Sequence, residues 1–383
     1  MSSGGDASVG GVVETVASHL VASALTTTMT VPFTDPRDTF VDVDLNDAAH
    51  STELDAALAA STGVATDALT AETFPLGPLL AGRIAALREQ VVDGPGLAIL
   101  RLPPDWMARA GEETSARVFV GLCTHLGQMC EQSKDLLEKV ARVEIPTDEA
   151  ILASPNTARR GYRNQKPQRV HVDASIPAPR GEGETDILAM MCVRPALDGG
   201  GASKLTSAEA LYAALSDQPQ HLARLAAGFH YDAGVEWLPA WRQSQRSAAP
   251  VPLLWRDSKD QVCVQFGVNM RKNLEAAYLP RATPPADGGG GEKEDGGGHV
   301  AVAMDAAGVD ALDALDAAAN SNACLHTLQL DSGCALICDN YRWMHGRTEF
   351  SDDDPAGSSG ADGDGDGGRL LIRLWLQTDD MRT

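Results

Sequence analysis

The sequence Arg-Val-His-Val-Asp-Ala occupies residues 169–174. Side chains alternate along a β-strand, so His171 and Asp173, two positions apart, share one face of a strand. An imidazole and a carboxylate supply two of the three ligands of a 2-His-1-carboxylate site, which binds Fe(II) and leaves the opposite face of the metal open. The third ligand must come from elsewhere. His345, within Asp-Asn-Tyr-Arg-Trp-Met-His-Gly-Arg at residues 339–347, is the candidate.

The His-x-Asp pair alone is weak evidence for a metal site. A chain with 9 His and 53 acidic residues among 383 contains about one such pair by chance (9 × 53/383). A second pair is indeed present, at His230-Tyr231-Asp232. Its position in a connecting segment favours an ordinary loop histidine, but the choice between the pairs needs the order of the surrounding elements.

Composition excludes several classes of protein. A net charge of −22 argues against a nucleic-acid partner, because nothing offsets repulsion by phosphates. The 7 Cys are odd in number and form no Cys-x-x-Cys, so we expect neither disulfides nor a zinc knuckle. No apolar run is long enough to span a membrane, and the first basic residue is Arg37, which fits neither a secretory signal nor an Arg-rich transit peptide. We therefore expect a soluble protein of the cytoplasm.

The chain is expected to hold one folded domain behind a leader. Residues 1–70 are rich in Gly, Ser, Ala and Thr and predict a partly disordered or helical leader, and residues 71–383 form the domain. Two Gly-rich acidic inserts, at 283–298 and 352–368, have almost nothing to bury and are expected to be disordered.

Periodicity predicts a mixture of helices and short strands. The expected helices are one through Leu79, Leu80, Ile84, Leu87 and Val91, one at Glu113–Leu126, and one that ends near Leu215 and opens with a capping box at Thr206 and Glu209. The expected strands are Leu97–Leu100, Asp186–Arg194, two strands within 250–269 around a turn at 257–260, a strand pair at Cys324–Leu330 and Ala335–Asp339, and Arg369–Leu376. This pattern indicates an α+β fold, a jelly-roll core with flanking helices.

In the order of its motifs along the sequence, the chain resembles the taurine dioxygenase superfamily of Fe(II)/2-oxoglutarate-dependent oxygenases, including its clavaminate-synthase-like members. The resemblance runs from Phe74 to Leu376 and rests on five blocks in the family's order: residues 93–101, 170–173, 186–203, 339–348 and 368–376. In the family the metal pair precedes the apolar strand and the Gly-rich turn. The resemblance therefore selects His171 and Asp173 over His230 and Asp232.

The resemblance implies a double-stranded β-helix in which His171, Asp173 and His345 hold Fe(II). It also implies that 2-oxoglutarate and O2 occupy the remaining metal positions, yielding succinate, CO2 and an oxidised substrate. Arg369 matches the arginine that binds the far carboxylate of 2-oxoglutarate, and Ser203 aligns where relatives often carry a threonine that bonds the same carboxylate.

Arg373 lies four residues after Arg369, on the same face of the last strand. A buried guanidinium is costly without an anion, so we expect Arg373 to bind an anionic group of the substrate. An internal Asp or Glu as its partner, or exposure on an edge strand, remain alternatives. The gap from His345 to Arg369 is longer than usual in the family, and the excess falls in the insert at 352–368.

The leading hypothesis is hydroxylation of a small anionic metabolite: an amino acid, carboxylate or sulfonate. Halogenation is disfavoured because it needs the carboxylate ligand replaced by Gly or Ala, and Asp173 is present. A non-catalytic jelly-roll binding protein and an oxygenase with a macromolecular substrate remain alternatives. Specificity is expected on variable loops, here residues 162–169, 231–246 and 283–298. The sequence sets neither the substrate, nor hydroxylation over desaturation, nor the oligomeric state.

Overall fold

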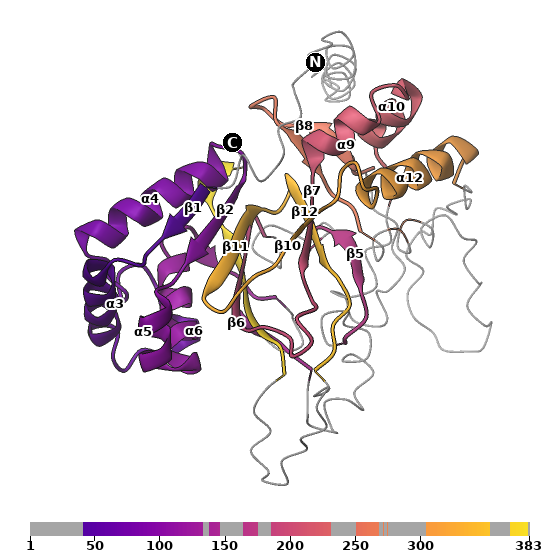
Figure 1. The fold of residues 1–383 in the computed structure, drawn as a ribbon. Coiled ribbons are helices and arrows are strands. Elements are labelled where there is room, and N and C mark those ends of the chain that lie inside the picture. The colour runs from indigo at the N-terminus through magenta and orange to yellow at the C-terminus, as the bar shows by residue number, and fades with distance from the viewer. Residues whose placement is uncertain are drawn as a thin grey trace, which may run out of the picture.

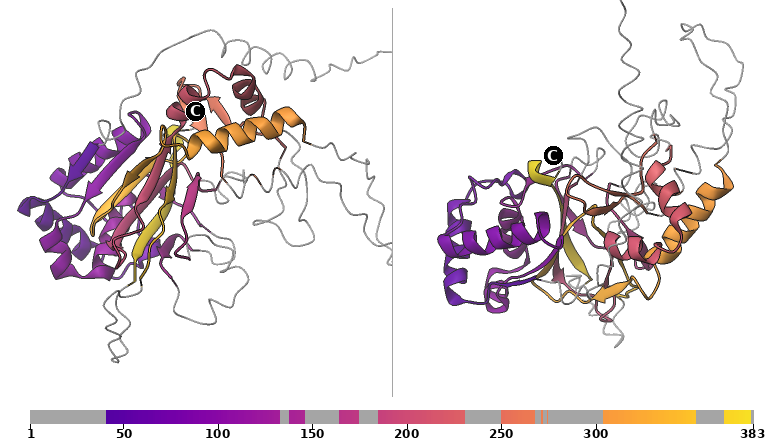
Figure 2. Two further views of the ribbon diagram at one scale, coloured as in Figure 1. Left: turned by 45° about the vertical axis from the view of Figure 1, so that its right-hand side comes forward. Right: turned by 90° about the horizontal axis from the view of Figure 1, so that it is seen from above.

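The computed structural model describes residues 41–132, 138–145, 164–174, 185–230, 250–267, 271, 274, 304–352 and 368–381. Two β-sheets form the centre of the molecule, and each is covered on its outer face by a separate group of helices (Figure 1). The view from above shows the N-terminal helices on one side of the sheets and the later helices on the other (Figure 2).

The larger sheet has strands in the order β1-β2-β11-β6-β13-β3, with β4 also paired to β13. Only β1 and β2 pair in parallel among these strands. The strands are β1 (Val41–Asp44), β2 (Leu97–Arg101), β3 (Gln128–Met129), β4 (Val140–Val143), β6 (Ile187–Arg194), β11 (Cys334–Asp339) and β13 (Leu370–Gln377). The helices on its outer face are α3 (Ala48–Ala60), α4 (Pro78–Val92), α5 (Pro104–Ala110) and α6 (Glu112–Cys123). Two short 3-10 helices lie at Thr66–Ala68 and Asp379–Met381.

The smaller sheet is antiparallel, in the order β10-β7-β12-β5. Its strands are β5 (Gln168–His171), β7 (Ser203–Ser207), β10 (His326–Leu328) and β12 (Trp343–Arg347). The elements over its outer face are α9 (Ala208–Ala214), α10 (Pro219–Ala227), α12 (Ala306–Ala319) and the two-stranded sheet of β8 (Leu254–Arg256) and β9 (Val262–Val264).

Alternation along β13 shows how one strand serves two cores. Ile372 and Leu374 pack with the N-terminal helices, whereas Leu371 and Trp375 face the interior between the sheets. That interior also receives Leu205 from the smaller sheet. Two facing sheets with side chains interdigitating between them, flanked by helices, confirm the predicted α+β class with a jelly-roll core.

The structure differs from the predicted leader at residues 41–69. Val43 on β1, Leu54 on α3 and Leu69 are buried in the same core as α4 and β13, and β1 extends the larger sheet. The alternation Val-Asp-Val-Asp at 41–44 is the signal of this strand. These residues pack on the domain, α3 agrees with the partly helical leader that was expected, and the division at residue 70 stays a prediction.

Most expected elements are present, with two corrections. The strands predicted at Cys324–Leu330 and Ala335–Asp339 exist as β10 and β11, but they do not pair: β10 joins β7 in one sheet, and β11 joins β2 and β6 in the other. The cap of α9 is Ser207, whose hydroxyl accepts the Ala210 N–H, whereas the Thr206 hydroxyl donates to Ala319 O. Local patterns do not specify which strands become neighbours.

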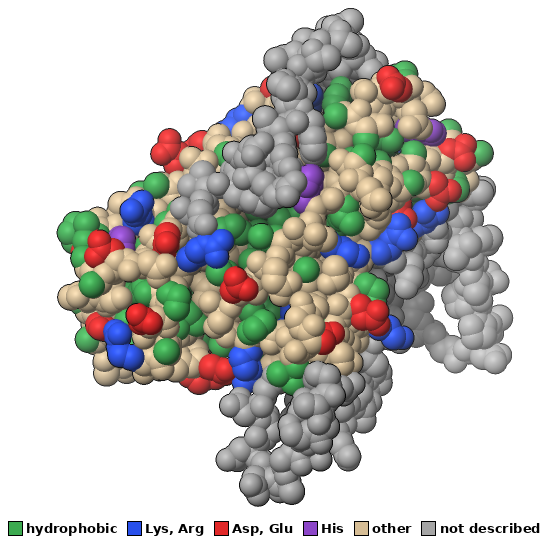
Figure 3. Space-filling view, viewed as in Figure 1, with side chains coloured by type: hydrophobic (Ala, Val, Ile, Leu, Met, Phe, Trp, Pro, Cys, Tyr) green, Lys and Arg blue, Asp and Glu red, His purple; other side chains and the backbone are tan. Residues whose placement is uncertain are grey.

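Several expectations fall outside the described residues. These are the leader before residue 41, Asp232, the loop at 231–246, the insert at 283–298, and the insert at 352–368 apart from its two end residues. No helix within the described ranges is both long and apolar enough to cross a membrane. On the face shown in Figure 3, acidic and basic side chains lie intermingled over the described residues.

Candidate active site

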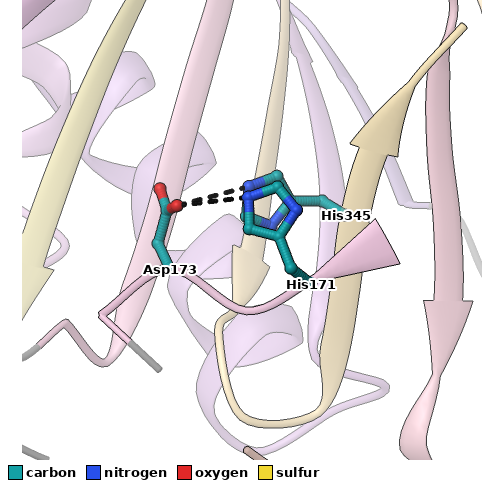
Figure 4. Close-up of side chains that lie close together, drawn as sticks. All are labelled: His171, Asp173 and His345. Atoms are coloured by element: carbon teal, nitrogen blue, oxygen red, sulfur yellow. Dashed lines mark ion pairs between the residues drawn. The ribbon is translucent and has the colours of Figure 1, made fainter. Parts of the chain in front are cut away.

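Neighbouring strands of the smaller sheet bring three side chains together. His171 ends β5 and His345 lies on β12, and their Cα atoms are paired across the two antiparallel strands. Asp173 follows β5 by two residues, so the chain returns its carboxylate toward the same point (Figure 4). This is the set that the sequence predicted, drawn from segments more than 170 residues apart.

The geometry of the three side chains suits a metal ion. Asp173 Oδ1 lies 3.6 Å from His171 Nε2 and 3.7 Å from His345 Nε2, and the ligand atoms all lie within 4.8 Å of one another. The two imidazole rings are tilted, with centroids 4.5 Å apart. Two imidazole nitrogens and one carboxylate oxygen converging on one point form the donor set of a facial Fe(II) site.

A hydrogen bond orients the imidazole of His171, and burial keeps the imidazole of His345 neutral. His171 Nδ1 lies 3.0 Å from Arg169 O; because a carbonyl only accepts, Nδ1–H donates in this bond, and Nε2 is the nitrogen turned toward Asp173 Oδ1. His345 is buried; burial and the neighbouring His171 lower its pKa to about 3. Its Nδ1 has no hydrogen-bond partner within the described part of the chain.

The backbone and side chain of Asp173 are both held. The Asn340 side chain accepts the Asp173 N–H at 3.0 Å and donates to the Asp173 carbonyl at 2.9 Å, so one amide fixes the peptide on both sides. Asp173 Oδ2 accepts from Arg373 Nη1 at 3.0 Å and from Trp375 Nε1 at 2.8 Å. Asp173 Oδ1 is thus the oxygen turned toward the imidazoles.

The charge of Asp173 is stabilised despite its burial. Burial alone raises the pKa of the carboxyl group, but Arg373 together with His345 and His171 outweighs this and holds the pKa well below its usual range. Asp173 is therefore a carboxylate over the whole physiological pH range, as a metal ligand must be.

The two arginines of the last strand have different surroundings. Arg373 is buried, and besides Asp173 it donates through Nε to Gln132 Oε1 at 2.8 Å. The internal carboxylate considered as its partner is thus Asp173 itself, and the burial of Arg373 does not require an anion on the substrate. The third alternative, an exposed edge-strand arginine, is not what the structure has.

Arg369 lies just before β13, buried beside the Gly-rich turn. Its Nη2 donates to Gly201 O at 3.1 Å, and its guanidinium lies over the Phe350 ring. Burial lowers its pKa. Ser203 is also buried, two residues beyond Gly201. These groups are suited to hold a carboxylate such as the far end of 2-oxoglutarate.

Two glycines leave room for Arg369 and His171. A Cβ on Gly201 would lie 2.7 Å from Arg369 Nε, and one on Gly267 would lie 2.8 Å from His171 Cβ. Gly201 also has φ +72°, a conformation that glycine adopts without strain. Glycine is therefore needed at position 201 of the turn after β6, because a larger residue would clash with Arg369.

Sequence reasoning missed Trp375, Asn340 and Gln132 at this site. Trp375 sits in an apolar strand, where a tryptophan indicates core, and Gln132 lies in a polar stretch in which nothing distinguishes it from its neighbours. Asn340 lies within the block at 339–348, but its residue type alone does not indicate a role. The competing histidine, His230, is half-buried beside Phe229, outside the cluster that forms the candidate site.

Comparison with known proteins decides the family. The family model described as taurine catabolism dioxygenase TauD, TfdA family matches residues 61–375, most of the chain. The chain belongs to this family. As a TauD/TfdA member it is an Fe(II)/2-oxoglutarate-dependent dioxygenase, which removes the alternative of a non-catalytic binding protein. No curated protein matches the chain significantly.

Solved structures similar to this chain include iron oxygenases in complex with amino acids. An asparagine oxygenase in complex with Fe(II), (2S,3S)-3-hydroxyasparagine and succinate is 19% identical with a TM-score of 0.58, over 88% of this chain and 93% of that one. The non-heme iron oxygenase OrfP in complex with Fe and alpha-ketoglutaric acid is 15% identical with a TM-score of 0.56, over 89% and 94%. OrfP with Fe and L-Arg is 14% identical, with a TM-score of 0.56 over 88% and 94%. At these identities the likeness establishes the fold.

Proposed function

We propose that this TauD/TfdA-family enzyme hydroxylates a small anionic metabolite, an amino acid or a related acid, with conversion of 2-oxoglutarate and O2 to succinate and CO2. The observation that carries the proposal is the convergence of His171, Asp173 and His345, with Asp173 Oδ1 3.6 and 3.7 Å from the two imidazole nitrogens. The amino-acid ligands of the similarly folded asparagine oxygenase and OrfP support the substrate class.

His171 Nε2, His345 Nε2 and Asp173 Oδ1 would hold the Fe(II) ion. Bound Fe(II) with 2-oxoglutarate would activate O2, the oxidant, so that one oxygen atom enters succinate and the other a C–H bond of the substrate. Two of the ligands need no deprotonation at neutral pH, because the lowered pKa of His345 leaves its imidazole uncharged and the lowered pKa of Asp173 leaves its carboxyl group ionised. Burial of His345 and Asp173 keeps water away from that side of the site.

Arg369 and Ser203 would bind the far carboxylate of 2-oxoglutarate. Arg369 offers a buried guanidinium, and the side chain of Ser203 is also buried. β12 connects this region to the metal ligands, because Arg347 on β12 pairs with Ser203, and His345 two residues before it pairs with Leu205. A cosubstrate lying along this strand would reach from the metal to Arg369.

Arg373 remains our candidate for contact with an anionic group of the substrate. Its Nη1 already lies 3.0 Å from Asp173 Oδ2, so its guanidinium is in contact with one of the proposed metal ligands. A substrate held beside the metal would meet this positive charge, and Gln132 orients it. Arg373 thus has two roles in this proposal, toward Asp173 and toward the substrate.

The experiment is a turnover assay with matched substrates. The purified protein with Fe(II), 2-oxoglutarate and O2 is offered amino acids, sulfonates and small carboxylic acids, each carboxylate alongside its neutral carboxamide. We expect succinate to form in step with a product heavier by one oxygen atom, for carboxylates and not carboxamides. Equal turnover of the carboxamides would contradict the anionic substrate. Turnover of peptides alone would favour a macromolecular substrate, and unchanged activity of His345→Ala would remove the proposed metal site.

We also propose that the enzyme works in the cytoplasm on a small molecule. All seven cysteines are free and buried in the structure, which suits a reducing compartment. We expect the enzyme to be fully active in buffers that contain reduced glutathione at a cytosolic concentration. Activity that requires oxidised cysteines would contradict this proposal.

A further inference from the structure

The two oxygens of Asp173 have unlike surroundings. Oδ1 faces both imidazoles, whereas Oδ2 accepts two hydrogen bonds, from Trp375 Nε1 at 2.8 Å and from Arg373 Nη1 at 3.0 Å. Both donors come from β13 of the larger sheet, and the imidazoles come from the smaller sheet. The carboxylate is therefore oriented by one sheet toward ligands on the other.

We propose that Trp375 is a positioning residue that, with Arg373, makes Asp173 a one-oxygen metal ligand. The inference rests on the metal site of the proposed function and adds to it the reason why one more coordination position stays open. A carboxylate can bind a metal through one or two oxygens. Here the lone pairs of Oδ2 are directed to donors on the opposite side, so only Oδ1 is free to bind.

Trp375 is well suited to this role because its donor is permanent and its ring is fixed. An indole N–H donates at every pH and cannot act as an acceptor. The ring is buried, and the Arg373 guanidinium lies 5.3 Å from it. Its backbone carbonyl accepts from Cys130 N at 3.0 Å and from Cys130 Sγ at 3.2 Å. These bonds hold the backbone that carries the indole, and the burial of the ring restricts its rotation away from Asp173.

The count of metal positions shows what the one-oxygen mode achieves. An octahedral ion bound by two imidazoles and one carboxylate oxygen has three positions left. Chelation by 2-oxoglutarate fills two of them and leaves one for O2. A carboxylate bound through both oxygens would fill that last position. Trp375 thus protects the position at which a gas molecule must bind.

The test replaces Trp375 with Phe, which keeps an aromatic ring and removes the N–H. Fe(II) affinity of the full-length protein is measured first, and then, without O2, the affinity of its Fe(II)·2-oxoglutarate form for nitric oxide, a probe of the open position. Loss of a hydrogen bond to a charged group should lower nitric oxide affinity roughly tenfold, because Oδ2 now competes for the position. Fe(II) affinity should stay within about threefold of wild type, because Asp173 Oδ2, once freed from the Trp375 hydrogen bond, can itself bind the metal.

Trp106→Phe is the matched control. Its Nε1 donates to Asp55 Oδ1 at 2.7 Å, so the same indole–carboxylate bond is removed between α5 and α3, on the outer side of the larger sheet. This variant should match wild type in both affinities. The difference between the two variants isolates the effect at Asp173 from the general cost of losing a buried hydrogen bond.

Three results would overturn the inference. They are a Trp375→Phe variant with wild-type nitric oxide affinity, a variant that loses Fe(II) affinity while its nitric oxide affinity is unchanged, and a Co(II)-bound crystal structure of the wild-type protein with both Asp173 oxygens on the metal. The last needs no variant, so it decides even if Trp375→Phe does not fold. Absence of Fe(II) binding by the wild type would instead contradict the proposed function.

Discussion

Arg373 and Asp173, 200 residues apart in sequence, form a buried ion pair at 3.0 Å that joins the two sheets beside the candidate metal site. The pair shows why a guanidinium is tolerated in the barrel interior: its counter-charge is the carboxylate offered to the metal. The arginine therefore affects folding, metal binding and the electrostatics of the substrate position together.

The pair predicts a strong effect of Arg373→Met on the metal-free protein. Removing one partner of a buried ion pair leaves the other charge uncompensated and typically costs roughly 3–5 kcal/mol. In the wild type the lowered pKa of Asp173 gives stability that is present above its unfolded pKa near 4 and is lost as the pH falls. We expect the free energy of unfolding of the variant to fall less than that of the wild type as the pH is lowered, as measured by urea unfolding from pH 3 to 7. Equal pH dependence in both proteins would contradict the pairing.

Asp339 should have the opposite pH dependence. Burial raises the pKa of its carboxyl group to about 7, with Asp186 adding to the increase and Arg342 opposing it. A folded-state pKa above the unfolded value gives stability that is full below pH 4 and is lost as the pH rises through 7. Asp339→Asn keeps an acceptor for the Tyr341 N–H and should remove this decline. Urea unfolding at pH 5 and 8 measures it, and an unchanged slope would show that Asp339 is ionised throughout.

Gly201→Ala should weaken 2-oxoglutarate binding more than it weakens the fold. The new Cβ would lie 2.7 Å from Arg369 Nε, so the guanidinium must move. Gly199→Ala is the control, since Gly199 has the same left-handed φ, +71° against +72°, and nothing within 4 Å of its Cβ position. Both variants should lose about 1 kcal/mol of stability, and only Gly201→Ala should lose cosubstrate affinity, by roughly tenfold if one charge-assisted contact is lost. Calorimetric titration with 2-oxoglutarate would contradict this if both variants bound alike.

Gly267→Ala should act on metal binding through His171. Its Cβ would lie 2.8 Å from His171 Cβ, and the imidazole must shift away from Asp173 Oδ1. Displacing a ligand support typically costs about 10–100-fold in metal affinity. Gly82→Ala on α4, with open space at its Cβ, should leave metal affinity unchanged. A Mn(II) titration compares the two, and equal affinities would show that His171 does not need this space.

The sequence was most informative where chemistry and spacing coincide. The pair His171 and Asp173 and the distant His345 could be predicted as one site because the His-x-Asp pair is followed, in the family's order, by an apolar strand and a Gly-rich turn. The burial of Arg373 was also predictable from its apolar strand. The partner of Arg373 was not predictable, because the sequence does not show that Asp173, in the segment after β5, lies opposite this strand.

Other features depend on contacts that no local pattern records. The sequence around Trp375 indicates a core residue, and Trp375 is buried, yet its indole N–H also orients Asp173. The pairing of β10 and β11 with different sheets is a matter of topology, which alternation along a strand does not specify. Residues 41–44 have a strand pattern, but the Gly- and Ser-rich composition before them favours a leader.

The most direct test of the central claim is anaerobic titration of the metal-free protein with Fe(II) in the presence of 2-oxoglutarate. Chelation of the iron by the cosubstrate gives a charge-transfer absorption band only when both bind at one site. The account predicts that the band saturates at one Fe(II) per chain, is abolished in His345→Ala and Asp173→Ala, and needs a much higher 2-oxoglutarate concentration in Arg369→Ala. A wild-type protein without the band, or a band that survives in His345→Ala and Asp173→Ala, would contradict it.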